Sequence, residues 1–292
     1  MSDHLKLGLA LAREALARNG FSRQPEPMVM DEAEQVMAYA DSGRQDDGVM
    51  AVSNLFHAAH ATTAISGAKK VIDLGCGPAT QLVRIARLNP DTHFIGVELS
   101  PNMIGSARAF IRNQGITNVE VIEGDITRLD GISDQSIDGV ISTMTLHHLP
   151  SLGHLKTCFQ QIRRVMKPNA GIYLADFGRF KSLQTVQFFA HMHEATLPPE
   201  VVQDYEYSLK AAFSPSEYRE IVEAEIPGAA TVHATFMAPF MVIIKSPTDR
   251  VTDPALRQKL KTLREVLSPG FQRDLDDLRL FFRLGGLSDD FL

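Results

Sequence analysis

A carboxylate stands inside a short apolar run, and two closely spaced glycines follow that run. The stretch KKVIDLGCGPATQ, residues 69–81, places Asp73 inside the run and Gly75 and Gly77 directly after it. Apolar residues followed by glycines and then by an amphipathic run predict a strand, a turn and a helix. Glycines at such a turn let the backbone approach a ligand, and open α/β sheets bind ligands at the carboxyl ends of their strands. The stretch therefore predicts a site for a nucleotide-like cofactor.

The details of this turn bear on which cofactor it binds. Thr80 stands where the dinucleotide fingerprint G-x-G-x-x-G has its third glycine, which allows close helix packing. The carboxylate of Asp73 would repel a pyrophosphate but would tolerate a cofactor that carries an ammonium group. The Asp-x-Gly-x-Gly pattern resembles motif I of the class I S-adenosylmethionine (SAM)-dependent methyltransferases. The resemblance implies that Gly75, Cys76 and Gly77 form the cofactor-binding turn.

A second acid, Glu98, ends the predicted strand 92–98 and lies 21 residues after Gly77. An acid at this place can accept hydrogen bonds from ribose hydroxyls. Glu98 matches the family's motif, and the resemblance implies that Leu99 and Met103 flank the adenine. Dehydrogenases also use an acid here, so Glu98 supports cofactor binding without choosing between cofactors.

A third acid occurs in the segment EGDI, residues 123–126, after the predicted strand 118–122. The resemblance implies that Asp125 accepts a hydrogen bond from the adenine amino group, while Gly124 and Ile126 complete the adenine site. A turn-forming Gly-Asp pair is the simpler explanation of this segment alone. Three acids at three successive strand ends favour the cofactor site.

The predicted strand 137–142 runs into STMTLHHLP, which resembles the Leu-His-His-Leu ending of small-molecule methyltransferases. The resemblance implies that Thr143 faces the methionine part of the cofactor. His147 or His148 could act as a general base if the acceptor carries a proton that must leave near the transition state. Packing alone would also explain the pair. His191, His193 and Glu194 are alternative candidates for the base.

No metal site is predicted. The segment HMHE, residues 191–194, lacks the HExxH spacing and a third ligand. His57 and His60, on a predicted helix at 49–65, have no carboxylate or cysteine at useful spacing, so packed or solvent-facing side chains explain them better. The only cysteines, Cys76 and Cys158, exclude a Cys₄ zinc site and weigh against an arsenic methyltransferase, which would need a cluster of thiols.

Strand and helix patterns alternate from residue 69 to the predicted strand 171–177, which indicates right-handed βαβ crossovers and a mainly parallel α/β sheet. Two further predicted strands, 231–236 and 240–245, are joined by a three-residue turn and must pair antiparallel. A parallel sheet closed by one hairpin resembles the seven-stranded, Rossmann-like methyltransferase fold. The predicted domain covers residues 67–246, between a helical N-terminal extension at 1–66 and a C-terminal helical appendage at 247–292.

Residues 178–228 have no strand pattern and contain two aromatic-rich stretches, so we expect a lid over the acceptor. Candidate substrate-pocket residues are Tyr39, His191, Tyr205 and Tyr207, because aromatic walls suit a planar or partly apolar acceptor. Aromatic residues at these spacings are at least as often part of a core.

The amino-acid composition argues against two kinds of partner, nucleic acids and membranes. The formal net charge is −6 and no basic run occurs, which argues against a nucleic-acid partner. No stretch reaches the ~18 apolar residues of a membrane span, and two distant cysteines suit a reducing cytoplasm, so we expect a cytoplasmic protein without a membrane partner. The apolar stripes of the terminal helices need cover, and they could form a homodimer.

The resemblance as a whole implies SAM-dependent methyl transfer to an O, N or C atom of a small molecule, a peptide or natural product included. Such an SN2 displacement needs mainly alignment and desolvation. The base-methylating signature [Asn/Asp]-Pro-Pro-[Tyr/Phe] is absent. Two alternatives stay open: a SAM-binding sensor or scaffold without activity, and a nucleotide-dependent oxidoreductase, although no Tyr-x-x-x-Lys pair occurs.

Overall fold

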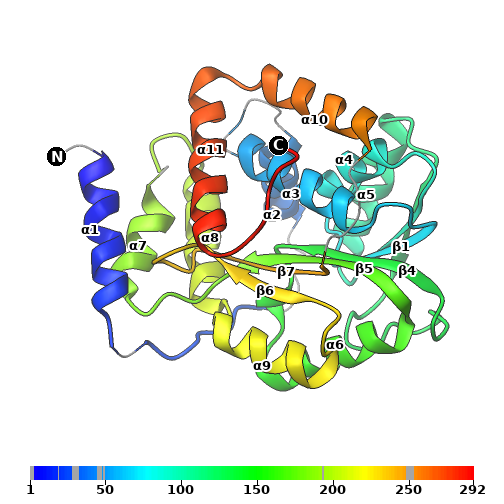
Figure 1. Ribbon diagram of the computed structural model, residues 1–292, viewed down its shortest axis with the longest axis horizontal. Coiled ribbons are helices and arrows are strands. Elements are labelled where there is room, and N and C mark those ends of the chain that lie inside the picture. The colour runs from blue at the N-terminus through cyan, green and yellow to red at the C-terminus, as the bar shows by residue number, and fades with distance from the viewer. Residues whose placement is uncertain are drawn as a thin grey trace.

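The computed structural model describes residues 3–18, 20–27, 33–44, 48, 50–192, 194–247 and 253–292. Within these residues seven strands form one sheet in the order β3-β2-β1-β4-β5-β7-β6 (Figure 1). The strands are β1 (Lys70–Leu74), β2 (His93–Glu98), β3 (Val119–Glu123), β4 (Ile137–Thr143), β5 (Met166–Phe177), β6 (Thr231–Ala234) and β7 (Met241–Lys245). The first five are parallel, and β7 runs antiparallel to both β5 and β6. The predicted Rossmann-like sheet with a terminal hairpin is confirmed.

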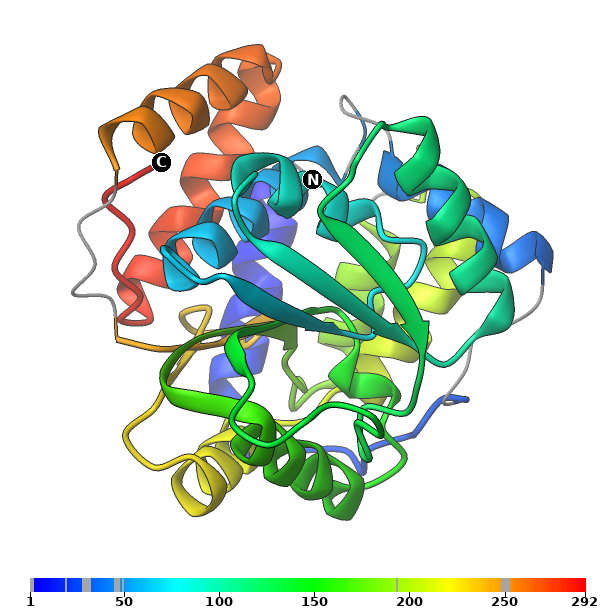
Figure 2. The same cartoon turned by 90° about the vertical axis from the view of Figure 1, so that its right-hand side faces the viewer.

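Helices cover both faces of the sheet (Figures 1 and 2). One face carries α3 (Ala51–Ala64), α4 (Thr80–Leu88), α5 (Pro101–Asn113), α10 (Pro254–Val266) and α11 (Pro269–Leu284), and the other carries α6 (Leu152–Val165) and α9 (Pro215–Glu225). Alternate strand residues point to opposite faces. Val71 and Phe94 accordingly join the core beneath α3 and α4, whereas Ile72 and Ile95 join the core against α6.

Local sequence signals set several helix starts. Ser100 caps α5 by accepting a hydrogen bond from the Met103 amide, with Pro101 at the first helical position. Ser214 and Glu217 form a complete capping box at the start of α9. Both starts carry a Ser-Pro pair in the sequence, the residue types favoured at these two positions.

Strand β5 begins five residues earlier than predicted, at Met166 instead of Gly171. Met166 pairs with Ile137 and Gly171 pairs with Gly139, so residues 167–170 bulge out of the ladder. Pro168 lies in this bulge, where its missing N–H leaves no ladder hydrogen bond unmade.

The hairpin strands are shorter than predicted, because β6 ends at Ala234 and β7 begins at Met241. The Thr235 hydroxyl closes the longer loop between them by donating to the Ala238 carbonyl and accepting from the Met241 amide.

The N-terminal extension reaches both the sheet and the helices beside it. Helix α2 (Ala33–Arg44) contacts α4, α5 and α8 (Pro199–Ala211), while α1 (Asp3–Leu16) packs on α7 (Leu183–His191). Helix α3 covers the apolar side of α11, where the Phe56 and Phe282 rings stack 5.1 Å apart. Helix α3 thus supplies part of the cover that the apolar stripe of α11 needs. A homodimer through the terminal helices stays a prediction.

The predicted lid region divides between two places. Helices α7 and α8 pack with α1 at one end of the molecule, on the left in Figure 1, whereas α9 packs on α6 and β6 against the sheet. Phe189 stacks on Phe180 and Phe240 inside the α1–α7–α8 cluster. The lid stays a prediction and is restricted to α7 and α8, because α9 belongs to the cover of the sheet.

Two further features complete the fold. His57 and His60 are both buried, with His57 Nδ1 2.6 Å from the Tyr173 hydroxyl and His60 Nδ1 3.4 Å from Lys245 Nζ, so both are packed in the core. Among the described residues, no helix combines the length and the apolar character that crossing a membrane requires.

Candidate active site

The glycine turn after β1 lies against the turn after β4. The amides of Gly75 and Cys76 both donate to the Val97 carbonyl, at 2.9 and 3.0 Å. Gly75 has a φ of 69°, and a Cβ there would lie 2.1 Å from the Thr145 side chain, whose hydroxyl donates to the Gly75 carbonyl. The glycine is thus required by the approach of Thr145. A Cβ at Gly77, whose φ is 51°, would meet nothing within 4 Å, so this part of the turn faces open space.

Asp73 lies beneath this turn with 4% of its surface exposed. Burial, together with the charge of Glu98, raises the pKa of Asp73 to about 8. The carboxyl makes no hydrogen bond or ion pair with any part of the chain that the structure describes. A buried acid without a partner fits a ligand that brings its own cation, as the ammonium group of SAM does.

The Glu98 carboxylate is hydrogen-bonded to the glycine turn after β1 and to the backbone that follows β2. One carboxylate oxygen accepts from the Leu99 and Ser100 amides at 2.8 and 2.9 Å, and the other accepts from the Gly77 amide at 2.9 Å. A carboxylate offers about four lone-pair sites, so about one is left for a ribose hydroxyl in this arrangement. The ribose contact of Glu98 stays a prediction, and these backbone donors limit the number of ribose hydrogen bonds that the carboxylate can accept.

The remaining predicted cofactor residues follow on the neighbouring strands. Asp125 accepts with Oδ1 from both the amide and the hydroxyl of Thr127, at 2.7 Å each, which leaves Oδ2 towards other donors. The Gly124 amide donates to the Glu98 carbonyl at 2.9 Å and so joins the ends of β2 and β3. Met103 is buried, whereas Leu99, Ile126, Cys76 and Thr143 range from buried to half-buried at the same edge of the sheet.

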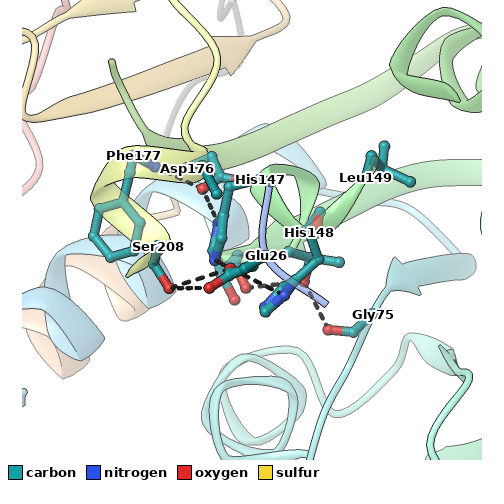
Figure 3. A network of polar contacts seen from close by, with 12 residues as sticks. Glu26, Gly75, His147, His148, Leu149, Asp176, Phe177 and Ser208 are labelled. Carbon is teal, nitrogen blue, oxygen red and sulfur yellow. Dashed lines mark hydrogen bonds and ion pairs between the residues drawn. The ribbon is translucent and has the colours of Figure 1, made fainter. Parts of the chain in front are cut away.

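His147 lies between two carboxylates (Figure 3). Its Nδ1 is 2.5 Å from Asp176 Oδ1, its backbone amide donates to Asp176 Oδ2 at 2.9 Å, and its Nε2 is 3.3 Å from Glu26 Oε1. Burial lowers the pKa of this imidazole, but the charges of Asp176 and Glu26 outweigh burial and raise it overall. Both ring nitrogens therefore face acids.

His148 is the second member of the short helix η1 (Leu146–His148) to face Glu26. Its Nδ1 lies 3.1 Å from Glu26 Oε1 and 3.4 Å from the Pro27 carbonyl, and its side chain is 25% exposed. Burial and the charge of His147 lower the pKa of His148 to about 3. Burial raises the pKa of Glu26 to about 7, although the charge of His147 acts in the opposite direction. The Ser208 hydroxyl lies 3.4 Å from both carboxylate oxygens of Glu26.

Glu26 belongs to a segment that we call the strap, residues 20–27, which runs from α1 across the histidine turn. Arg23 holds it there by donating to the carbonyls of His147, Leu149, Pro150 and Ala211 at 2.5–2.9 Å. The Arg23 guanidinium also lies 3.9 Å from the centre of the Phe213 ring. The strap thus places a buried carboxylate on the two histidines.

Sequence analysis missed three residues of this site: Arg23, Glu26 and Asp176. Asp176 stands near the end of β5, the same kind of position that drew attention to Glu98, so the strand-end rule could have found it. Glu26 and Arg23 lie in a segment with no strand, helix or motif pattern, and nothing local indicates their distant partners.

The predicted pocket residues separate into two groups. Tyr39 is 39% exposed, yet burial of its hydroxyl near Asp204, Glu98 and Asp176 raises its pKa to about 12. The Tyr205 ring lies 5.3 Å from Phe177, which in turn lies 5.2 Å from the His147 ring. These two tyrosines therefore border the site.

His191 and Tyr207 are not brought to the site. His191 is exposed and pairs with Glu194 at 2.9 Å and with Glu206 at 3.2 Å. Tyr207 is 48% exposed and accepts a hydrogen bond from Gln203. His193, an alternative base, lies outside the described residues.

Comparisons with known proteins agree with this arrangement. A family model described as a methyltransferase domain matches residues 65–226, more than half of the chain. The arsenite methyltransferase of Halobacterium salinarum is 31% identical over 117 residues, 40% of this chain and 29% of that protein. A tRNA (guanine-N(7)-)-methyltransferase of Pseudoalteromonas atlantica is 35% identical over 98 residues, 34% of this chain and 39% of that protein. The chain thus spans well under half the length of both relatives.

Among solved structures, the plantazolicin methyltransferase BpumL in complex with S-adenosylhomocysteine superimposes with a TM-score of 0.57. The match covers 89% of this chain and 91% of BpumL at 14% sequence identity, and so concerns the fold. The sheet order, the acids at its edge and the match of the domain model lead to one assignment. The chain belongs to the class I SAM-dependent methyltransferases, enzymes whose methyl donor is SAM.

Proposed function

We propose that the chain methylates an O, N or C atom of a small molecule that is neutral or cationic. The observation that carries this proposal is the acidic, covered edge of the sheet. Asp73, Glu98 and Asp176 lie at the ends of three strands, and the strap adds Glu26. A nucleic acid normally requires a basic patch, and this edge of the sheet carries acids instead, which disfavours a polyanion such as tRNA.

The cover over the edge supports the same conclusion. The strap lies on the histidine turn with the Glu26 side chain only 6% exposed, and the Tyr39 hydroxyl of α2 is buried near enough to Glu98 and Asp176 for their charges to raise its pKa. An acceptor must fit beneath these segments or displace them. A small acceptor meets this condition, whereas a folded RNA surface does not enter such a covered edge without a large rearrangement.

The chain's own residues have separate tasks in the proposed reaction. SAM supplies an electrophilic methyl group when bound. Asp73 would hold its ammonium group, Glu98 a ribose hydroxyl and Asp125 the adenine amino group. Phe177 and Tyr205 would provide an apolar wall that excludes water near the acceptor.

The general-base role of the histidine pair stays a prediction. The hydrogen bonds of the two rings restrict this role to one nitrogen atom. Both ring nitrogens of His147 face carboxylates, and Nδ1 of His148 faces Glu26. Only His148 Nε2 makes no hydrogen bond with the described residues and has a lone pair for a proton from an acceptor, but a pKa of about 3 makes His148 a weak base in the free protein. If it does, His148→Ala should lower turnover by ~10² or more at unchanged SAM affinity.

The proposal is tested by measuring S-adenosylhomocysteine formation from SAM in the presence of different acceptors. One set contains small phenols, amines and carbon nucleophiles of neutral or positive charge, and the other contains bulk tRNA. We expect turnover with members of the first set only, and none above background for Asp73→Ala at limiting SAM. Methylation of tRNA without turnover of any small acceptor would contradict the proposal.

A further inference from the structure

Three side chains from distant parts of the chain converge at the histidine turn. Glu26, His147 and His148 each present a ligand atom, and these atoms all lie within 4.8 Å of one another. We infer that this cluster binds one divalent transition-metal ion of the zinc class, with Glu26 Oε1, His147 Nε2 and His148 Nδ1 as ligands. The inference concerns binding and does not depend on the proposed acceptor.

The distances between the ligand atoms suit a small ion. Glu26 Oε1 lies 3.3 Å from His147 Nε2 and 3.1 Å from His148 Nδ1. In a tetrahedral zinc site with ligands at about 2.0–2.2 Å, neighbouring ligand atoms are about 3.3–3.6 Å apart. Two of the three ligand pairs therefore lie within a few tenths of an ångström of this spacing, and the two imidazole nitrogens lie within 4.8 Å of each other.

Asp176 supplies the outer support that metal-binding histidines usually have. An imidazole that donates Nδ1–H to Asp176 at 2.5 Å directs the lone pair of its Nε2 towards Glu26. A lone pair that faces a carboxylate at 3.3 Å is unfavourable unless a cation or a proton lies between them. A carboxylate–histidine–metal chain of this kind fixes the tautomer and the ring orientation.

The backbone around the ligands is also held in place. Arg23 donates to the His147 and Leu149 carbonyls at 2.7 Å each, which ties the strap to the turn that carries both histidines. The ligand side chains are shielded, with 6% of Glu26, 3% of His147 and 25% of His148 exposed. A preformed and shielded set of ligands loses little entropy when an ion binds.

The donor set selects the class of ion. Two imidazole nitrogens and one carboxylate oxygen suit Zn²⁺, Co²⁺ or Ni²⁺, whereas Mg²⁺ and Ca²⁺ prefer oxygen ligands throughout. Three protein ligands leave one position for water or for an acceptor atom, as in catalytic zinc sites. With a metal on its Nδ1, the neutral His148 imidazole carries its proton on Nε2, so metal binding excludes the general-base role predicted for that atom.

The competing explanation is a proton in place of the ion. His147 would then be an imidazolium between Asp176 and Glu26, and His148 would donate its Nδ1–H to Glu26. Both explanations satisfy the same distances, so a metal titration separates them.

The experiment uses the full chain, freed of metal with a chelator and then titrated with Zn²⁺ by calorimetry in the absence of SAM. We expect one equivalent to bind with a micromolar or tighter dissociation constant. Glu26→Gln and His148→Ala should each weaken binding by more than the about 10- to 100-fold expected for Asp176→Asn, which removes only the outer support. With Co²⁺ as the probe, visible absorption of the four-coordinate type should appear and be absent in Glu26→Gln.

His191→Ala is the matched control, because His191 forms an exposed cluster with Glu194 and Glu206 that could bind Zn²⁺ weakly. This variant should keep the wild-type affinity. Circular dichroism confirms that each variant is folded, and Glu26→Gln, which keeps the side-chain shape, decides if His148→Ala does not fold. No saturable binding in the wild type overturns the inference, as does binding that Glu26→Gln leaves unchanged or that His191→Ala abolishes.

Discussion

Replacing Asp73 by Asn should remove most of the pH dependence of SAM binding between about pH 6 and about pH 7.5. In the free protein, burial and the charge of Glu98 raise the pKa of Asp73 to about 8, so the carboxyl is mostly protonated at neutral pH. The ammonium group of SAM favours the ionised form, and binding must therefore release this proton. Ionisation costs about 1.4 kcal/mol for each pH unit below the pKa. Because the pKa is raised, affinity should increase as the pH rises.

The magnitude follows from the ionised fraction of Asp73. That fraction grows about 20-fold over this range, so wild-type affinity should rise about 10- to 20-fold. The range stops there because the amino group of SAM loses its own proton near pH 8. A hydrogen bond to the ionised carboxylate contributes about 1.5–3 kcal/mol, so Asp73→Asn should bind about 3- to 40-fold more weakly at the upper end of the range. Near about pH 6 the free energy needed to ionise Asp73 offsets the free energy of the hydrogen bond, so the wild type and Asp73→Asn should bind SAM with similar affinity.

Isothermal titration calorimetry with SAM at several pH values and constant ionic strength measures how the affinity of the wild type and of Asp73→Asn changes with pH. Glu123→Gln is the control, because Glu123 is an exposed carboxylate two strands away, at the end of β3, and its loss should leave the slope unchanged. A wild-type affinity that stays flat or falls with pH would refute the reasoning. The same holds if Asp73→Asn keeps the wild-type slope.

Three further outcomes are expected. Glu98→Ala should weaken SAM binding about 10- to 100-fold by calorimetry, because a charged acceptor for the ribose is lost; unchanged affinity would place the ribose elsewhere. Arg23→Ala should lower the free energy of unfolding in urea by about 2–4 kcal/mol, since four carbonyls lose a charged donor; a change below about 0.5 kcal/mol would show that the strap is not anchored. Amides of α7 and α8 should gain protection from hydrogen exchange when S-adenosylhomocysteine and acceptor bind, whereas high and unchanged protection would identify a static cap.

The sheet could be predicted because its signals are local. Each parallel strand is a short apolar run whose length or alternation is typical of a strand and not of a helix. Each crossover helix follows its strand after a short turn. Helix starts at Ser100 and Ser214 depend on residues three positions apart. The start of β5 could not be predicted, because Met166 belongs to the sheet only through its pairing with Ile137, which precedes the bulge at residues 167–170.

The candidate site was predictable only where it follows strand ends. Asp73, Glu98 and Asp125 lie at the sheet edge as expected from their positions, although Glu98 proves to be largely engaged by backbone amides. The acids around the histidines are different. Glu26 comes from a segment without secondary structure, and its burial against His147 arises from tertiary packing alone.

The strap also determines the order in which the chain can fold. Arg23 bonds to carbonyls 124 to 188 residues further along, so these contacts form only after most of the chain has left the ribosome. At about 5–20 residues per second, this delay is roughly 10–40 seconds. Leu7 and Leu11 of α1 pack into the same α1–α7–α8 cluster, so these side chains also gain their native cover only after α7 and α8 have been synthesised. A segment that docks last onto a finished sheet can also detach without disturbing it, so we expect its opening to cost less than global unfolding and to give newly bound molecules their way in.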